Sequence, residues 1–198
     1  MSTIPLAPLT PDQPLDLPSR GRVGMLSLII GESAIFTIFV VAYVFYIGKS
    51  LYGPTPAQVL EVPIFNTVCL LSSSFFIWLA EGSIEKNRMR RFLLWWSTTI
   101  CLGIVFLVGT AREWLKLIYH DGLTIRTNLF GTTFYSLVGL HATHVVVGLL
   151  MLLLVLVFTL TGHVKESHTE RIQVLALYWH FVDAVWVVVF TVVYIIGR

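Results

Sequence analysis

Five ionisable side chains lie inside long apolar stretches of the sequence: Glu32, His141, His144, His180 and Asp183. An apolar environment makes such groups costly, so each needs a partner or a function. His141 and His144 are three residues apart, as are His180 and Asp183, and each pair would share one helix face. Imidazoles from two helices can ligate a haem iron, and hydrogen bonds between helices explain the same spacing equally well. The residues alone leave both interpretations open.

Glu32 lies well inside the first apolar stretch, between Gly31 and Ser33. One interpretation of this carboxyl group is proton handling or contact with a lipid headgroup. The other is a neutral carboxylic acid that is hydrogen-bonded to a neighbouring helix. The first interpretation gives the residue a function, and the second gives it only a structural role.

Other kinds of chemistry have no matching pattern in the sequence. It contains neither G-x-x-x-x-G-K-[ST] nor G-x-G-x-x-G, the glycine-rich motifs that bind phosphates. Cys69 and Cys101 form no C-x-x-C and lie apart from any histidine cluster, which argues against a zinc site and a disulfide framework. The formal net charge of +2 is too small to indicate a nucleic-acid partner.

The elements that carry these residues are predicted to be membrane-spanning helices. The chain of 198 residues is 56% hydrophobic and only 12% charged, against about 25% charged residues in ordinary soluble domains. Five stretches are long and apolar enough to cross a bilayer as helices. They cover residues 23–47, 62–80, 92–111, 129–160 and 174–196. The prediction is an all-α integral membrane bundle of five transmembrane helices, forming a single domain over residues 22–198.

The ends and connections of the spans predict how the bundle is oriented. Residues 1–21 are rich in proline, and we expect an extended N-terminal arm. Eight of the thirteen Lys and Arg residues fall on the side of the N-terminus, which places the N-terminus inside and the C-terminus outside. Trp95 and Trp96 follow the most basic connection and are expected in the interfacial aromatic belt.

Three segments together closely resemble one family. Residues 178–186 read YWHFVDAVW, residues 139–145 read GLHATHV with Gly148 following, and residues 63–75 read PIFNTVCLLSSSF. They resemble subunit III of the haem–copper respiratory oxidases, the cytochrome c oxidase subunit III family, in its five-span bacterial form. The resemblance extends over nearly all of residues 22–198.

The resemblance implies a supporting subunit of a proton-pumping terminal oxidase, most similar to a cytochrome c oxidase, in the bacterial cytoplasmic (inner) membrane. Such a chain docks on subunit I, with subunit II, small subunits or a respiratory supercomplex as further partners. It has no catalytic residues, haem or copper of its own; the haems and copper belong to subunits I and II. It binds phospholipid and supports proton uptake and the stability of the complex.

Other identities stay open at this stage. The chain also resembles subunit III of quinol oxidases and the related small subunit associated with nitric oxide reductase. Two alternatives belong to a different class of protein. One is a free-standing transporter, which would show helices broken around a midplane site, and the other is a cytochrome b.

The family pattern extends to individual residues. Glu32 occupies the place of the family's intramembrane glutamate and becomes a candidate for proton uptake or lipid contact, which predicts reaction with hydrophobic carbodiimides. His141, His144, His180 and Asp183 become a structural polar network rather than ligands. Arg171, at the inner end of the last span, is a candidate for contact with a lipid phosphate, the alternative being a solvated loop arginine. Two departures are the missing first two spans of the longer members and Gln173, where many members have glutamate.

Overall fold

The computed structural model describes residues 19–50, 52–162 and 168–198, and these residues form helices and connections without a strand. The long helices, in chain order, are α1 (Arg20–Tyr46), α3 (Ile64–Glu85), α4 (Met89–Tyr119), α5 (Leu129–Leu160) and α6 (Thr169–Phe190). A short α2 (Pro56–Val59) lies in the connection before α3, and a π-helical turn, η2 (Thr191–Ile196), continues α6. The predicted all-α class is confirmed. The predicted arm lies outside the described residues, except that α1 already begins at Arg20.

Five helices are long and apolar enough to cross a membrane, as the sequence predicted. Several extend beyond the apolar stretches that predicted them. The stretch 62–80 corresponds to a helix that ends at Glu85, and the stretch 92–111 to one that covers Met89–Tyr119. Hydropathy marks only the part that needs an apolar environment, whereas backbone hydrogen bonds continue the helix through polar residues at its ends.

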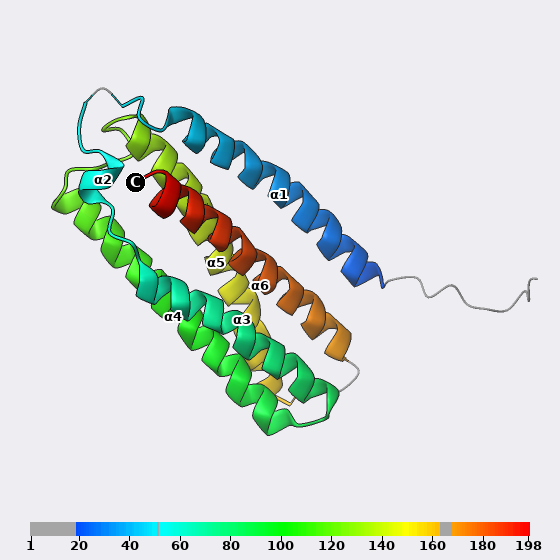
Figure 1. The fold of residues 1–198 in the computed structure, drawn as a ribbon. Coiled ribbons are helices and arrows are strands. Elements are labelled where there is room, and N and C mark those ends of the chain that lie inside the picture. Colours follow the sequence, from blue (N-terminus) through cyan, green and yellow to red (C-terminus); the bar gives the residue numbers. More distant parts are fainter. Residues whose placement is uncertain (1–18, 51, 163–167) are drawn as a thin grey trace, which may run out of the picture.

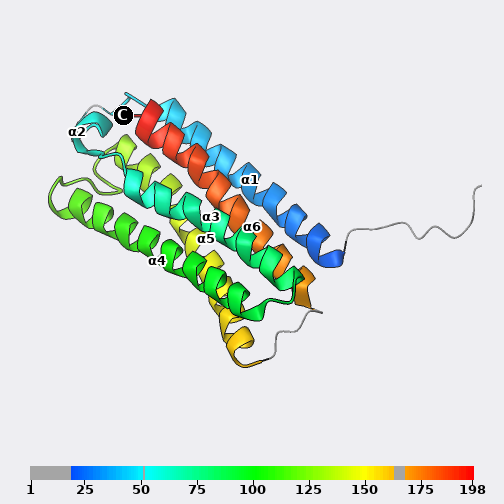
Figure 2. The same cartoon turned by 60° about the horizontal axis from the view of Figure 1, so that its bottom comes forward.

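The helices form one bundle in which α6 packs against α1, α3 and α5 (Figures 1 and 2). The most extensive contact is that of α3 with α4, and α1 packs on α5, α6 and η2. A tight turn joins α3 to α4: Asn87 adopts a left-handed φ of 53°, and the Arg88 amide donates to the Ser83 carbonyl at 2.9 Å. The start of α1, the α3–α4 turn and the start of α6 lie at one end of the bundle, here called the basic end because Arg20, Arg22, Lys86, Arg88, Arg90, Arg91 and Arg171 gather there.

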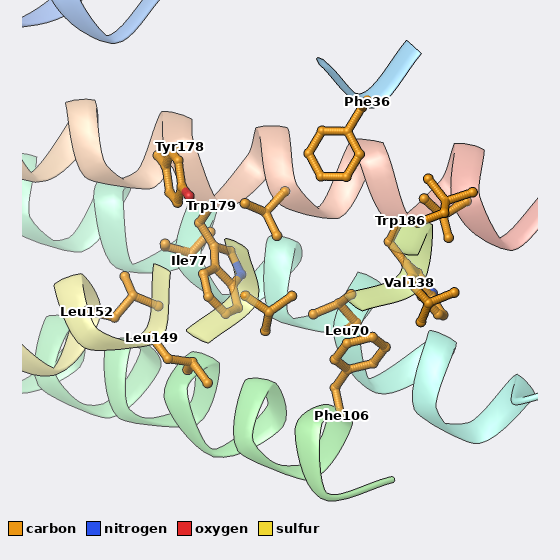
Figure 3. Packing of buried hydrophobic residues seen from close by; sticks show 14 of the residues in the cluster. Phe36, Leu70, Ile77, Phe106, Val138, Leu149, Leu152, Tyr178, Trp179 and Trp186 are labelled. Atoms are coloured by element: carbon orange, nitrogen blue, oxygen red, sulfur yellow. The ribbon is translucent and has the colours of Figure 1, made fainter. Parts of the chain in front are cut away.

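The core of the bundle is built around two tryptophans of α6, Trp179 and Trp186, both almost fully buried (Figure 3). The Trp179 ring lies against Gly148 of α5 and Gly103 of α4, where a Cβ atom would come within 3.0 Å of it. Small residues such as these let membrane helices approach closely. Trp186 donates from Nε1 to the Thr67 hydroxyl of α3 at 3.2 Å.

One sequence expectation about the tryptophans is wrong. Trp96 does not face the membrane interface but is fully buried, and its Nε1 donates to the Leu152 carbonyl of α5 at 2.9 Å. Its neighbour Trp95 is half-buried and stacks on Phe76. Successive residues on a helix are about 100° apart, and here that turn points Trp96 into the bundle while Trp95 lies between its interior and its surface.

Candidate functional site

Glu32 and His144 meet between α1 and α5. His144 Nε2 lies 3.0 Å from Glu32 Oε2, and His144 Nδ1 lies 2.8 Å from the Leu140 carbonyl of its own helix. A carbonyl only accepts, so Nδ1 must carry a hydrogen. The Nε2–Oε2 contact then needs a proton of its own, which sits on either the imidazole or the carboxyl group. The pair therefore holds one shared proton in both of its forms, imidazolium–carboxylate and imidazole–carboxylic acid.

The surroundings of this pair leave it within reach of the bundle surface. The Phe36 ring of α1 covers the His144 ring at a centroid distance of 4.9 Å. The Glu32 side chain is 24% exposed and that of His144 is 12% exposed. The carboxyl group is thus hydrogen-bonded to a neighbouring helix, and part of the Glu32 side chain is exposed at the surface of the bundle.

Asp183 and His180 form a second cluster, between α6 and α3. The Ser74 hydroxyl donates to Asp183 Oδ2, and His180 Nδ1 lies 3.1 Å from the same hydroxyl. Because Ser74 gives its only hydrogen to the carboxylate, His180 Nδ1 is the donor in this contact. His180 Nε2 also lies 3.7 Å from Glu81. Every one of these contacts crosses from α6 to α3, so the cluster fixes the rotation of the two helices.

Next to this cluster, Ser73 is shared by two residues of α6. Trp179 Nε1 donates to the Ser73 hydroxyl at 2.8 Å, and that hydroxyl lies 3.4 Å from Asp183 Oδ2. The serine itself donates to the Leu70 carbonyl at 2.6 Å. The core tryptophan and the buried carboxylate are thus held by the same segment of α3.

His141 takes part in neither cluster. It is fully buried, and neither ring nitrogen has a hydrogen-bond partner among the described residues. Its neighbours are aromatic: the Trp186 ring at 5.0 Å, the Phe106 ring at 5.9 Å and the Phe36 ring at 6.5 Å between centroids. The four residues expected in one network thus occupy two clusters and an aromatic cage.

Arg171 lies at the basic end and is exposed. It lines a cavity of about 440 Å³ between the end of α5 and the start of α6, together with Phe158 and Leu175. No contact brings it to Glu32 or to Asp183 in the described part of the chain.

One partly buried contact near the opposite end of the bundle was not predicted from the sequence. Tyr194 of η2 donates to Glu113 of α4 at 2.8 Å. The sequence gives little indication that Glu113 is partly buried, because it follows Arg112 at the edge of an apolar stretch and resembles an interfacial charge. Ser73, Ser74 and Glu81, which complete the Asp183 cluster, were also missed as partners, although three successive serines in an apolar stretch are unusual.

No group of three or more His, Cys, Asp or Glu side chains within residues 19–50, 52–162 and 168–198 could hold a metal ion. The intramembrane histidines contact carboxylates, serines, backbone carbonyls or aromatic rings. The fold and these contacts define a multi-pass helical membrane protein whose buried polar residues join its own helices.

The comparisons with known proteins identify the family. The protein-family model described as cytochrome c oxidase subunit III matches residues 19–198. The chain belongs to the cytochrome c oxidase subunit III family, whose members are subunits of haem–copper oxidases.

Three relatives show the range of similarity. The chain is 35% identical to cytochrome c oxidase subunit 3 of Thermostichus vulcanus, over 89% of this chain and 87% of that protein. It is 30% identical to the protein of the same name from Bacillus sp. (strain PS3), over 96% and 93% of the two chains. It is 27% identical to a probable quinol oxidase subunit 3 of Staphylococcus saprophyticus, over 89% of each chain.

Proposed function

We propose that this chain is a supporting subunit of a proton-pumping cytochrome c oxidase in a bacterial cytoplasmic membrane, without catalytic residues of its own. It contacts subunit I directly, and subunits I and II hold the haems and copper. The observation that carries this proposal is how its polar residues are used: the contacts of Glu32 and Asp183 join helices of the bundle. The helix α1 supports a docking role, because only 11% of its most apolar segment is buried within the bundle. The rest needs lipid or another subunit to cover it.

The Glu32–His144 pair is the proposed point of support for proton uptake. It carries one shared proton in both of its forms, and the Glu32 side chain is 24% exposed. Exchange between these forms moves the proton by less than the 3.0 Å between the two atoms. A group of this kind relays a proton near subunit I without performing redox chemistry itself.

Two further parts of the proposal concern the membrane. The basic end faces the cytoplasm, which follows from the Lys and Arg bias. A phospholipid occupies the cavity beside Arg171, with its phosphate at the guanidinium group and its chains along Phe158 and Leu175.

A quinol oxidase subunit III is the second candidate, and the relative from Staphylococcus saprophyticus favours it. Donor choice resides in subunits I and II. Affinity purification of this chain from its membrane in mild detergent, with an optical spectrum and identification of its partners, decides between the two. A cytochrome-c-binding subunit II supports the first candidate, and a quinol-type subunit II replaces it with the second.

The supporting role itself is tested by removing the chain from the purified oxidase. We expect the initial rate of oxygen reduction to be largely retained while the number of turnovers before inactivation falls. Adding back the wild-type chain restores the working life, and a Glu32→Gln chain restores it only in part. Loss of the haem–copper site on removal of the chain would contradict the proposal.

A labelling experiment examines Glu32 directly. A hydrophobic carbodiimide is expected to label the wild type and not the Glu32→Gln variant, with Glu113→Gln as a matched control because Glu113 lies near the other end of the bundle. Equal labelling of wild type and Glu32→Gln would show that Glu32 is not the reactive carboxyl group.

A further inference from the structure

An open cavity of about 820 Å³ lies at the basic end, where α3 and α4 are joined. Three cations line it, Lys86, Arg88 and Arg91. They stand within six residues of one another because the α3–α4 turn is tight: the left-handed Asn87 reverses the chain between them. The cavity is lined mainly by α3 and α4, with Gln173 of α6, and it shares no lining residue with the cavity beside Arg171.

The three cations are available to a ligand. All three are exposed, and none of their side chains forms a hydrogen bond or an ion pair with another described residue. Three like charges this close in the chain repel one another, and an anion bound between them relieves that repulsion. Arg88 and Arg91 carry planar guanidinium groups, which bind phosphate oxygens through paired hydrogen bonds.

Two carboxylates, Glu81 and Glu85, also line the cavity, and both contact residues of α6. Glu85 accepts a hydrogen bond of 2.7 Å from Gln173 of α6, and Gln173 in turn accepts one of 2.9 Å from Arg22 of α1. Glu81 lies 3.7 Å from His180. Both carboxylates thus contact α6, and neither forms an ion pair with a cation of the turn in the described part of the chain.

The wall of the cavity that continues along the helices is apolar and aromatic. It consists of Trp78 of α3, which is 59% exposed, and Leu94 of α4, which is 56% exposed, with Trp95 beside them. Trp95 stacks on Phe76 at a centroid distance of 5.6 Å, which fixes the wall between the two helices. Both helices are long and apolar enough to cross a membrane, so this wall lies on the lipid side of the turn.

From this arrangement we infer that the α3–α4 cavity binds one anionic phospholipid. Arg88, Arg91 and Lys86 hold the phosphate, and an acyl chain lies along Trp78 and Leu94. The apolar wall decides between a lipid and a free anion: inorganic phosphate would use the cations and leave the wall uncovered, whereas a phospholipid covers both. Tryptophan at the level of the headgroups is typical of such boundaries.

The test measures lipid binding to the delipidated full-length chain in detergent by native mass spectrometry, with dioleoyl phosphatidylglycerol as the probe. The cavity variant is K86Q/R88Q/R91Q. The charge-matched control is R20Q/R90Q/R126Q, which removes three cations that do not line the cavity. Circular dichroism confirms equal helix content, and the single variant Arg91→Gln serves if the triple variant does not fold.

One cation near a lipid surface contributes about a fivefold factor to binding, so three predict a loss of up to roughly a hundredfold. We expect phosphatidylglycerol affinity to fall at least about tenfold in the cavity variant and less than about threefold in the control, with weak binding of phosphatidylcholine throughout. Equal losses in the two triple variants would overturn the inference in favour of a diffuse electrostatic attraction.

A second arm separates the lipid from a free anion. Trp78→Ala is expected to weaken phosphatidylglycerol binding without changing the affinity for inorganic phosphate. Unchanged lipid binding in Trp78→Ala, or displacement of the lipid by millimolar phosphate, would assign the cavity to a free anion instead. Neither result bears on the supporting role in the oxidase, because the assay uses the isolated chain and no turnover.

Discussion

Replacing Gly148 by alanine tests the packing on which the whole bundle depends. A Cβ atom at this position would lie 2.9 Å from Cε3 and 3.0 Å from Cζ3 of Trp179. Carbon atoms that are not bonded to each other pack at about 3.5–4.0 Å, so the added methyl group intrudes by at least about half an ångström. The indole cannot simply shift. It is fully buried, donates to Ser73 at 2.8 Å, and already lies against Gly103 on α4.

The expected cost follows from overpacking a filled core, about 1–3 kcal/mol of unfolding free energy. Alanine also favours a helix over glycine by about 0.5–1 kcal/mol, which partly offsets the cost. Gly24→Ala isolates this gain, because no atom lies within 4 Å of a Cβ atom built there. The difference between Gly148→Ala and Gly24→Ala therefore measures the clash, and SDS-induced unfolding in mixed micelles followed by circular dichroism provides both values.

A double-mutant cycle tests whether the unfolding free energy lost in Gly148→Ala is caused by contact with Trp179. Phenylalanine at position 179 is smaller and removes ring atoms that the methyl group would meet, so Gly148→Ala should cost less in a Trp179→Phe background, with a coupling of about 1 kcal/mol or more. The reasoning is refuted if Gly148→Ala is as harmless as Gly24→Ala, or if its cost is unchanged in the Trp179→Phe chain.

Three further substitutions should lower the same unfolding free energy by predictable amounts. Ser73→Ala leaves the Trp179 N–H buried without its acceptor and is expected to cost about 1–3 kcal/mol, and Ser73→Thr, which keeps a hydroxyl group, should cost less. Asn128→Ala removes the side chain that caps the start of α5 and should cost about 1–2 kcal/mol. Asn128→Asp keeps the capping oxygen but loses the two hydrogen bonds that the amide donates to the Tyr52 and Pro54 carbonyls, so it should recover only part of that loss. Tyr194→Phe removes the hydrogen bond to Glu113 and should cost about 0.5–1.5 kcal/mol, a loss that must vanish when Glu113 is already leucine.

Composition and hydropathy were sufficient to predict the class of fold and the number of helices. Long apolar stretches leave little choice in a bilayer, because each backbone polar group must be satisfied within its own helix. The helix ends were less predictable. The extension of α4 to Tyr119 passes through Arg112 and Glu113, whose charges end the hydropathy signal but not the hydrogen-bonded helix.

Which polar residues meet could not be read from the sequence, because it depends on how each helix is rotated about its axis. The spacing of His141 and His144 correctly suggests one face, yet the two rings have different surroundings: one meets Glu32 at the edge of α1, and the other lies among aromatic rings. A difference of three residues turns a helix by about 300°, so such a pair is offset by about 60°. That offset decides which side chain reaches the neighbouring helix.

Along α1 only Phe36 and Tyr43 are buried, so this helix has less apolar packing against the bundle than the others. In a bilayer, lipid covers an apolar helix face as well as another helix does, and apolar residues alone would hold α1 weakly. The hydrogen bond from α1 to His144 and the one from Arg22 to Gln173 at the basic end supply the directional contacts that apolar packing does not. The long helix with the fewest buried side chains is therefore held in the bundle partly by these two hydrogen bonds.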